Sequence, residues 1–258
     1  MKCCQENILD YSEYIVKKVG KFLKKNFGQR KAIKFSKNRN IKIDEDLMAN
    51  KMYEDFFKKH TKDFGLYTEE GTRDQNKEYI WAIDPIEGTS NYRAGNPFWA
   101  TQIALLKNYK PVISFVYAPI LNMFFKAIKG SGSFLNDKKI KVSDTNKLDM
   151  ALVSIGKGID KNSLEIYKKL FTRVIVNVRT FRHFGACGLE LAMTSAGLID
   201  IYLNKGSNSI YDYSPGSLIV KEAGGIVTDF NGNKWNIKSN QIIASNKILN
   251  KLIIKVLD

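Results

Sequence analysis

The chain has little cysteine, histidine or proline: three, two and five residues respectively among 258. Cys3, Cys4 and Cys187 show no C-x-x-C spacing, so we expect reduced thiols with no disulfide framework and no structural zinc site. His60 and His183 lack the H-E-x-x-H spacing of a zinc hydrolase and are interpreted as ordinary helix or loop residues.

Long apolar segments and several common catalytic motifs are also missing. No stretch approaches the roughly 20 apolar residues that a membrane-spanning helix needs, and the first residues lack the apolar core of a signal peptide. The sequence has no Walker loop, G-x-S-x-G elbow or G-x-G-x-x-G fingerprint. We therefore expect a cytoplasmic protein with no membrane partner.

Acidic residues are fewer than basic ones: the chain has 26 Asp and Glu and 41 Lys and Arg, which gives a net charge of +15. Such a balance can indicate nucleic-acid binding, since basic side chains supply the phosphate contacts that dominate nonspecific affinity. The lysines are spread along the chain in pairs such as Lys24-Lys25 and Lys138-Lys139, with no arginine-rich block. A solvated basic surface is the favoured interpretation, and a nucleic-acid partner is the alternative.

What the chain does have is a loop rich in oxygen ligands, W-A-I-D-P-I-E-G-T-S-N at residues 81–91. Proline cannot donate to a sheet ladder, so the preceding apolar run is predicted to be a strand that ends at Asp84. The proline fixes the backbone direction, so that Asp84, the Ile86 carbonyl and Glu87 can face one cation. Oxygen ligands of this kind suit magnesium, although the same letters also fit an ordinary turn.

Gly88 and Thr89 follow these ligands and offer backbone N–H groups and a hydroxyl that can hold a phosphate or orient a water. Further acids stand where other walls of one site would be needed, with Glu69-Glu70 upstream and Asp212 downstream. This combination favours a metal-and-phosphate site over a simple turn.

Asp212 precedes a predicted helix over residues 214–223. Its apolar residues follow a helical pattern that stops at Gly224-Gly225, and Pro215 fits the first turn, where a missing N–H costs nothing. We therefore expect Asp212 just before or at the N-cap, either as a cap alone or as a cap that also faces a cation.

Two motifs carry a resemblance to a known family: W-x-x-D-P-[IL]-[DE]-G-T at residues 81–89, and [WY]-D-x-x-x-G-x-x-x-x-x-x-x-G-G at residues 211–225. With them the chain resembles the inositol monophosphatase family, including its SuhB-type bacterial members, over nearly its whole length. The resemblance implies a magnesium-dependent, lithium-sensitive phosphatase that is a homodimer.

The resemblance also implies a ligand set for two or three magnesium ions, which manganese can replace. Glu69, Asp84 and the Ile86 carbonyl would hold the first ion. Asp84, Glu87 and Asp212 would hold the second. Close cations of this kind can activate water and neutralise phosphate, so no nucleophilic side chain would be needed.

The remaining implied roles are catalytic and substrate-binding. Thr89, with Glu69 and Asp46, would orient and deprotonate the attacking water. Ala186 and Cys187 stand at the entry to a predicted helix, where their amides could shape the sugar pocket. A plain helix entry is the alternative. The expected substrate-binding set is Glu87, Gly88, Thr89, Ala186, Cys187, Lys205 and Asp212.

Several positions depart from the family pattern. Glu87 stands where aspartate is usual, and Asn50 stands where glutamate usually closes an A-D-x-x-x-E pattern. In the loop over residues 203–210, inositol-preferring members usually carry a glutamate, and the equivalent here is Asn204 or Lys205. A lysine would favour a substrate with a second phosphate, although a solvated loop charge is the more common fate of a lysine.

These departures bear on the substrate, a small phosphorylated sugar or polyol. Inositol 1-phosphate is the expected one. A fructose 1,6-bisphosphatase or 3′-phosphoadenosine phosphatase activity is the alternative if Lys205 faces the pocket. An alternative of another class is binding to RNA or to the transcription machinery, as in some SuhB-type relatives.

The apolar pattern predicts an N-terminal α+β half over residues 1–147, carrying Glu69 and the metal loop, and a C-terminal α/β half over residues 148–258, carrying Asp212. The first half is predicted to have helices at 8–27 and 44–60 and an antiparallel meander of strands at 79–83, 99–106, 112–117, 123–129 and 132–135. The second is predicted to alternate strands at 152–155, 174–178, 199–203, 226–230 and 241–244 with helices at 163–172, 185–196, 214–223 and 247–257. By the resemblance, the halves should pack as layered αβαβα with the metal loop at their seam.

Overall fold

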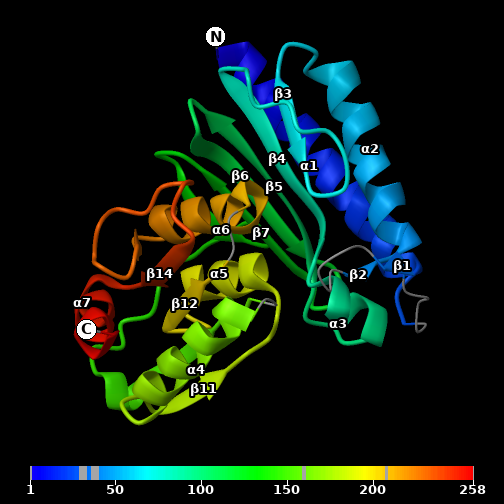
Figure 1. Ribbon diagram of the computed structural model, residues 1–258. Coiled ribbons are helices and arrows are strands. Elements are labelled where there is room, and N and C mark those ends of the chain that lie inside the picture. The colour runs from blue at the N-terminus through cyan, green and yellow to red at the C-terminus, as the bar shows by residue number, and fades with distance from the viewer. Residues whose placement is uncertain (1, 29–33, 36–40, 159–160, 207–208, 258) are drawn as a thin grey trace.

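The computed structural model describes residues 2–28, 34–35, 41–158, 161–206 and 209–257. Within this part of the chain, seven α-helices and two large sheets stack in the order helix, sheet, helix, sheet, helix (Figure 1). The predicted layered α+β fold is confirmed. None of the described helices combines the length and apolar character that a membrane crossing requires.

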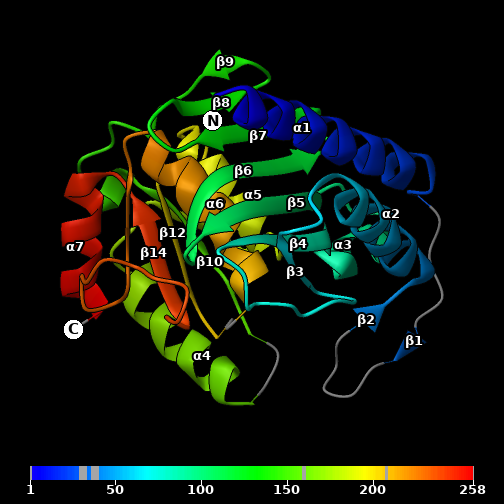
Figure 2. The ribbon, with the colours of Figure 1, turned by 90° about the horizontal axis from the view of Figure 1, so that it is seen from above.

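The first helical layer consists of α1 (Lys2–Lys25) and α2 (Asp44–His60). Both cover one face of the larger sheet (Figure 2), because the apolar stripe of α1 and the aromatic face of α2 pack against strand residues such as Trp81 and Phe115. A small antiparallel pair, β1 (Lys34–Phe35) and β2 (Ile41–Lys42), lies between the two helices in the chain.

The larger sheet has seven strands in the order β3-β4-β5-β6-β7-β8-β9. The predicted antiparallel meander is confirmed from β4 onward. β3 adds a parallel edge next to β4 that the sequence pattern did not predict. The strands are β3 (Gly65–Thr68), β4 (Tyr79–Glu87), β5 (Ala100–Lys107), β6 (Lys110–Ala118), β7 (Met123–Ile128), β8 (Gly132–Leu135) and β9 (Lys138–Lys139).

The middle layer is formed by α5 (Cys187–Ser195) and α6 (Ile210–Glu222), which lie between the two sheets (Figure 1). Both helices are buried almost all round. Small residues of the larger sheet, such as Ala100 and Ala127, pack against one side of this layer, and Tyr202 and Ile242 of the smaller sheet pack against the other. Apolar contacts on both sides of this layer therefore hold the two sheets together.

The smaller sheet has five strands in the order β11-β10-β12-β14-β13, with parallel and antiparallel neighbours. Its outer face is covered by α4 (Lys161–Ile175) and α7 (Lys247–Leu257) (Figure 2). A 3-10 turn, η2 (Leu148–Met150), leads into it. The strands are β10 (Leu152–Ile155), β11 (Thr180–Arg182), β12 (Ile201–Lys205), β13 (Ile226–Thr228) and β14 (Gln241–Ser245).

One predicted strand is wrong. Residues 174–178 were expected to be extended, but α4 continues through Ile175 and the strand that follows is β11. Val174 lies one turn beyond Leu170, and both are buried in the core under α4. Packing at this helical spacing outweighs the strand preference of the β-branched residues.

Candidate active site

The segment with the metal-ligand motif is the end of β4. The strand does not stop at Asp84, as the sequence predicted, but continues to Glu87. Its register against β5 shifts between Asp84 and Glu87. Such a bulge re-aims side chains. Both carboxyl groups are buried, with residue exposures of 3% and 8%.

The parallel pairing of β3 and β4 brings Glu69 beside Asp84. Thr68 is in register with Ile83, and the Glu69 N–H donates to the Ile83 carbonyl at 3.1 Å. Burial raises the pKa of Asp84 well above its usual range, and the charges of Glu69, Glu87 and Asp212 raise it further. The structure therefore gathers acids that lie far apart in the sequence.

Asp212 enters the cluster from α6, and its position corrects the prediction. The helix begins at Ile210 with Ser209 as N-cap, so Asp212 lies inside the first turn, and Pro215 lies in the helix interior. Proline leaves the carbonyl four residues earlier, that of Tyr211, without its helical donor. The Gln102 side chain takes over, because its Nε2 donates to this carbonyl at 3.0 Å. The helix therefore starts earlier than the proline suggested.

Gln102 links three parts of the site. Besides the Tyr211 carbonyl, its Nε2 contacts Glu87 Oε2 at 3.0 Å and Asp84 Oδ2 at 3.5 Å. The β4–β5 register places it directly opposite Asp84. Gln102 was not among the predicted site residues, although a glutamine inside the apolar run of a predicted strand was a usable signal, since a buried amide needs partners.

Glu87 reaches across to the start of α5. Its Oε1 accepts the Cys187 N–H at 3.1 Å, and its Oε2 accepts the Gly188 N–H at 3.3 Å and the Cys187 thiol at 3.1 Å. A carboxylate suits the positive end of a helix. Glu87, which stands where the family pattern has aspartate, thus joins β4 to α5. Its Oε1 accepts only one of these three hydrogen bonds.

Ala186 is the N-cap of α5, and its N–H is also engaged. It donates to Glu190 Oε2 at 3.1 Å, while Glu190 Oε1 accepts the Phe184 N–H at 3.2 Å and the Ser154 hydroxyl. Glu190 is buried and was missed by the sequence analysis. Its position in an otherwise apolar helix was the available signal.

The other predicted catalytic residues flank this cluster. Asp46 lies in the first turn of α2 with 1% exposure. Burial, followed by the charges of Glu69 and Glu70, raises the pKa of Asp46 to about 9. Thr89 begins the short helix α3 (Thr89–Ala94), and its hydroxyl donates to the Ile86 carbonyl at 3.0 Å.

Gly88, between β4 and α3, has a backbone that only glycine adopts readily. Its φ is +86°, and a Cβ there would lie 3.1 Å from Ala186 Cβ and 3.2 Å from the Phe98 carbonyl. A side chain would therefore be strained and crowded. The motif's glycine brings the start of α3 close to the segment before α5.

Lys205 and Asn204 end β12, where Lys205 pairs with Gln241. Asn204 is buried and donates to the Tyr202 hydroxyl at 3.2 Å. Lys205 is partly exposed, and no ion pair joins it to an acid in the described part of the chain. Residues 207–208 of the predicted substrate loop lie outside the described residues.

The assembled site could hold a divalent cation. Burial raises the pKa of Asp84, Glu87 and Asp212, and the charges that act on Asp84 and Asp212 come from acids alone. Asp84 Oδ1 is buried with no hydrogen-bond partner in the described residues. Ligand atoms of Glu87, Cys187 and Asp212 lie within 4.8 Å of one another. Clustered carboxylate oxygens of this kind are a donor set that suits a bound divalent cation.

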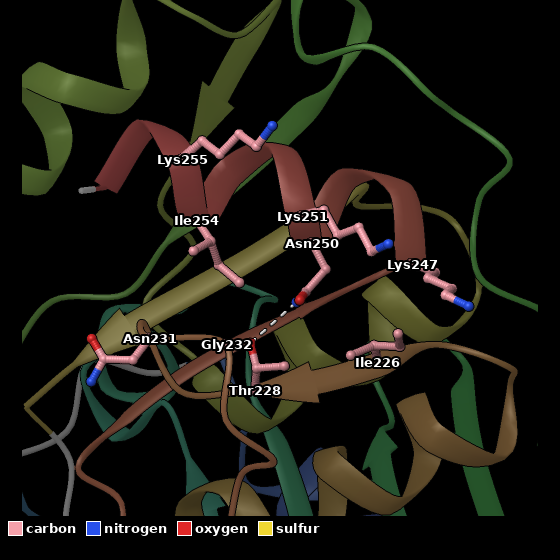
Figure 3. Close-up of a pocket in the computed structure, with 9 residues that line it drawn as sticks. All are labelled: Ile226, Thr228, Asn231, Gly232, Lys247, Asn250, Lys251, Ile254 and Lys255. Carbon is pink, nitrogen blue, oxygen red and sulfur yellow. Dashed lines mark hydrogen bonds between the residues drawn. The ribbon is translucent and has the colours of Figure 1, made fainter.

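A cavity of about 460 Å³ lies elsewhere, between α7 and the segment that follows β13 (Figure 3). Ile226 and Ile254 contribute apolar walls, and Asn250 donates to the Thr228 hydroxyl at 3.3 Å. No acid lines it. This cavity is separate from the carboxylate cluster.

Comparison with known proteins identifies the family of the chain. Residues 5–258 match the inositol monophosphatase family. The chain belongs to this family. It is 32% identical over 251 residues to the fructose-1,6-bisphosphatase/inositol-1-monophosphatase of Thermotoga maritima, covering 97% of this chain and 95% of that protein. It is 33% identical over 190 residues to the Nus factor SuhB of Xylella fastidiosa, covering 73% of this chain and 69% of the relative.

Comparison with solved structures supports the same family. Extragenic suppressor protein SuhB from Bartonella henselae superimposes with a TM-score of 0.91 at 28% identity, and the match covers 98% of both chains. Membership of this metal-dependent family makes the chain a phosphatase that acts on small phosphorylated substrates. The acidic cluster is where such a metal could bind.

Glu54 contacts Asn50, one of the departures from the inositol monophosphatase pattern. Asn50 occupies the usual glutamate position, and its amide donates to Glu54 Oε1 at 3.1 Å. The same oxygen accepts the Thr72 N–H at 2.8 Å and contacts the Thr68 hydroxyl at 3.4 Å. Burial opposes ionisation, but hydrogen bonds from Lys58, Thr72 and Asn50 lower the pKa of Glu54 to about 2. An acid one helical turn later thus anchors the segment that carries Glu69.

Glu54→Ala should loosen this segment. Leaving the Thr72 N–H without its acceptor costs about 1–3 kcal/mol, measurable by urea unfolding, and we expect weaker magnesium binding by calorimetry. Glu54→Gln keeps an acceptor and serves as the matched control. Adding Asn50→Glu to Glu54→Ala should restore much of both losses. A double variant no better than Glu54→Ala would show that the two positions are not interchangeable.

Proposed function

We propose that this protein hydrolyses a small phosphomonoester with magnesium as cofactor, inositol 1-phosphate being the first candidate. The observation that carries the proposal is the convergence of Glu69, Asp84, Glu87 and Asp212 on one cluster, in which burial and the neighbouring acids raise the pKa of Asp84 and Asp212. Cations bound to these carboxylates would offset their mutual repulsion and could also bind a phosphate.

In this proposal, Glu69, Asp84 and the Ile86 carbonyl hold a first magnesium, and Asp84, Glu87 and Asp212 hold a second. The bulge after Asp84 allows Asp84 and Glu87, both on β4, to face the same cluster. Glu87 would contribute through Oε1, which has one of the three donors that α5 supplies. Bound magnesium supplies Lewis-acid stabilisation of the charge on phosphate and of the leaving oxygen.

The chain's own groups orient the reactants. Thr89, whose hydroxyl now donates to the Ile86 carbonyl, would position the attacking water together with Glu69. The proton of this water would pass to Glu69, or to Asp46 once bound magnesium favours the ionised form of that carboxyl. The N–H groups of Gly88 and Thr89 at the start of α3 would receive the phosphate. Direct in-line attack by water follows, with no covalent intermediate.

The deciding experiment measures phosphate release from a panel of phosphomonoesters, with inositol 1-phosphate, fructose 1,6-bisphosphate and 3′-phosphoadenosine 5′-phosphate as the main arms. We expect release with magnesium, or with manganese in its place, and none in EDTA. Equal release in EDTA would contradict the proposed metal dependence, and release from none of the panel would contradict the substrate class.

Lys205→Glu tests which substrate fits. If Lys205 faces a second phosphate, this substitution should lower kcat/KM for fructose 1,6-bisphosphate by about 100-fold, because it removes a charge-assisted contact and adds repulsion. Turnover of inositol 1-phosphate should change little. Glu87→Asp is the control, since it acts on the shared cation and should alter both substrates in the same sense. Parallel changes in Lys205→Glu would make the lysine a bystander.

A second candidate is the transcription-related role that the name of the Xylella fastidiosa SuhB relative suggests. The charge of +15 is compatible with an RNA partner. Several of the described lysines instead pair with nearby acids, as Lys58 does with Glu54 and Lys168 with Glu165. The acidic cluster favours the phosphatase as the primary function.

A further inference from the structure

Cys187 places sulfur in the carboxylate cluster. Its Sγ lies 3.1 Å from Glu87 Oε2 and 3.7 Å from the Asp212 carbonyl oxygen. Ligand atoms of Glu87, Cys187 and Asp212 all lie within 4.8 Å of one another. The residue is partly exposed.

These three groups are a ligand set for a softer ion than magnesium. Zinc binds thiolate sulfur at about 2.3 Å and carboxylate oxygen at about 2.0–2.2 Å, usually with four ligands. Ligand atoms around such an ion are separated by about 3–4 Å, and those of this cluster lie within 4.8 Å of one another. Thiolate selects zinc-like ions, whereas magnesium prefers oxygen alone.

A second observation points to a cation at the same place. Asp84 is 3% exposed, and its Oδ1 has no hydrogen-bond partner in the described residues. Gln102 Nε2 contacts both Asp84 Oδ2 and Glu87 Oε2, so this acid belongs to the same cluster. An unpartnered buried carboxylate oxygen is costly unless an ion satisfies it.

We propose that Cys187, Glu87 and Asp212 form a binding site for thiophilic divalent cations such as zinc and cadmium. The S–H bond breaks, the proton passes to the buffer, and a sulfur–metal bond forms with no change of oxidation state. The thiol's hydrogen bond to Glu87 is lost at the same time. The site overlaps the second magnesium position of the proposed function, so the two kinds of ion compete.

Cadmium provides the test, because a thiolate–cadmium bond absorbs in the ultraviolet without any enzyme turnover. Titrating the full-length protein with cadmium should produce one saturating band. Cys3→Ser/Cys4→Ser is the matched control and should keep the band, whereas Cys187→Ser and Cys187→Ala should lose it. Magnesium should raise the apparent cadmium Kd of the wild type.

The opposite results would overturn the site. A band that persists in both Cys187 variants, or disappears in the Cys3/Cys4 variant, would place the bound ion on another thiol. Cadmium binding unaffected by saturating magnesium would separate the two sites. Asp212→Asn, which retains the thiol, provides a second variant and should weaken cadmium binding at least tenfold, by about 1.4 kcal/mol or more. Circular dichroism verifies that each variant is folded.

The proposed site for thiophilic cations rests on the proposed function only where it overlaps the second magnesium position. Phosphate release is measured separately without cadmium. A protein that shows the Cys187-dependent band but hydrolyses none of the phosphomonoesters would retain the site and lose the proposed activity. Hydrolysis without the cadmium band would support the phosphatase activity and refute the cation site at Cys187.

Discussion

Asp84→Asn should lower magnesium-dependent phosphate release by about three orders of magnitude. In the proposed site Asp84 belongs to the ligand sets of both cations, and stabilising developing charge by a metal contributes several kcal/mol, at about 1.4 kcal/mol per tenfold in rate. Asparagine has nearly the same shape but no charge. The measurement is kcat/KM on whichever substrate of the panel is turned over fastest.

The same variant should be more stable than the wild type when metal is absent. Burial and three neighbouring acids oppose ionisation of Asp84, so a neutral side chain relieves repulsion in the metal-free cluster. Thermal unfolding in EDTA should therefore shift upward, while the stabilisation that magnesium gives the wild type should shrink. Asp63→Asn, at an exposed acid outside the cluster, is the control. An unstable Asp84→Asn protein, or one with normal turnover, would contradict this role.

The metal loop could be predicted from sequence because its chemistry is local. Asp84, Glu87 and Thr89 lie within six consecutive residues, and the turn signals next to them are short-range. Glu69 and Asp212 could be associated with this loop only through motif spacing and family resemblance. Their actual convergence depends on β3 pairing with β4 and on α6 packing between the sheets.

The roles of the supporting residues could not be predicted, because these roles depend on tertiary register. Gln102 matters because β5 lies antiparallel to β4 with Asp84 opposite it, and because Pro215 frees the Tyr211 carbonyl. Glu54 contacts Asn50 because the two residues lie one turn apart on the same helix face. Residues of this kind show no motif of their own.

The helices and strands were predicted well where the apolar period was clear, as in α2 and the β4–β8 meander. The prediction was wrong where two local signals competed. Pro215 was taken as the beginning of α6, but a proline in the helix interior is tolerated here, since Gln102 satisfies the freed carbonyl. Sequence alone does not show that such a partner exists.

In EDTA, the wild-type protein should lose stability steadily as the pH rises from about 4 to about 9, and Asp46→Asn should lose less. The pKa of Asp46 is raised from 3.8 to about 9, first by burial and then by Glu69 and Glu70. Below about pH 4 the carboxyl is protonated in both states. Between the two pKa values only the folded state holds the proton, so each pH unit costs about 1.4 kcal/mol for this group.

Asp46→Asn removes that one titration and should make the slope of the free energy of unfolding against pH about 1.4 kcal/mol per unit shallower. Asp84, Glu87 and Asp212, whose pKa values are also raised, keep the remaining slope. Magnesium should reduce the slope of the free energy of unfolding against pH for both proteins, because a bound cation stabilises the folded state with ionised carboxylates. Urea unfolding at several pH values, with and without magnesium, measures all four curves. Equal slopes for wild type and Asp46→Asn in EDTA would show that Asp46 is ionised in the folded protein, and a magnesium effect absent from both would remove the cation from this cluster.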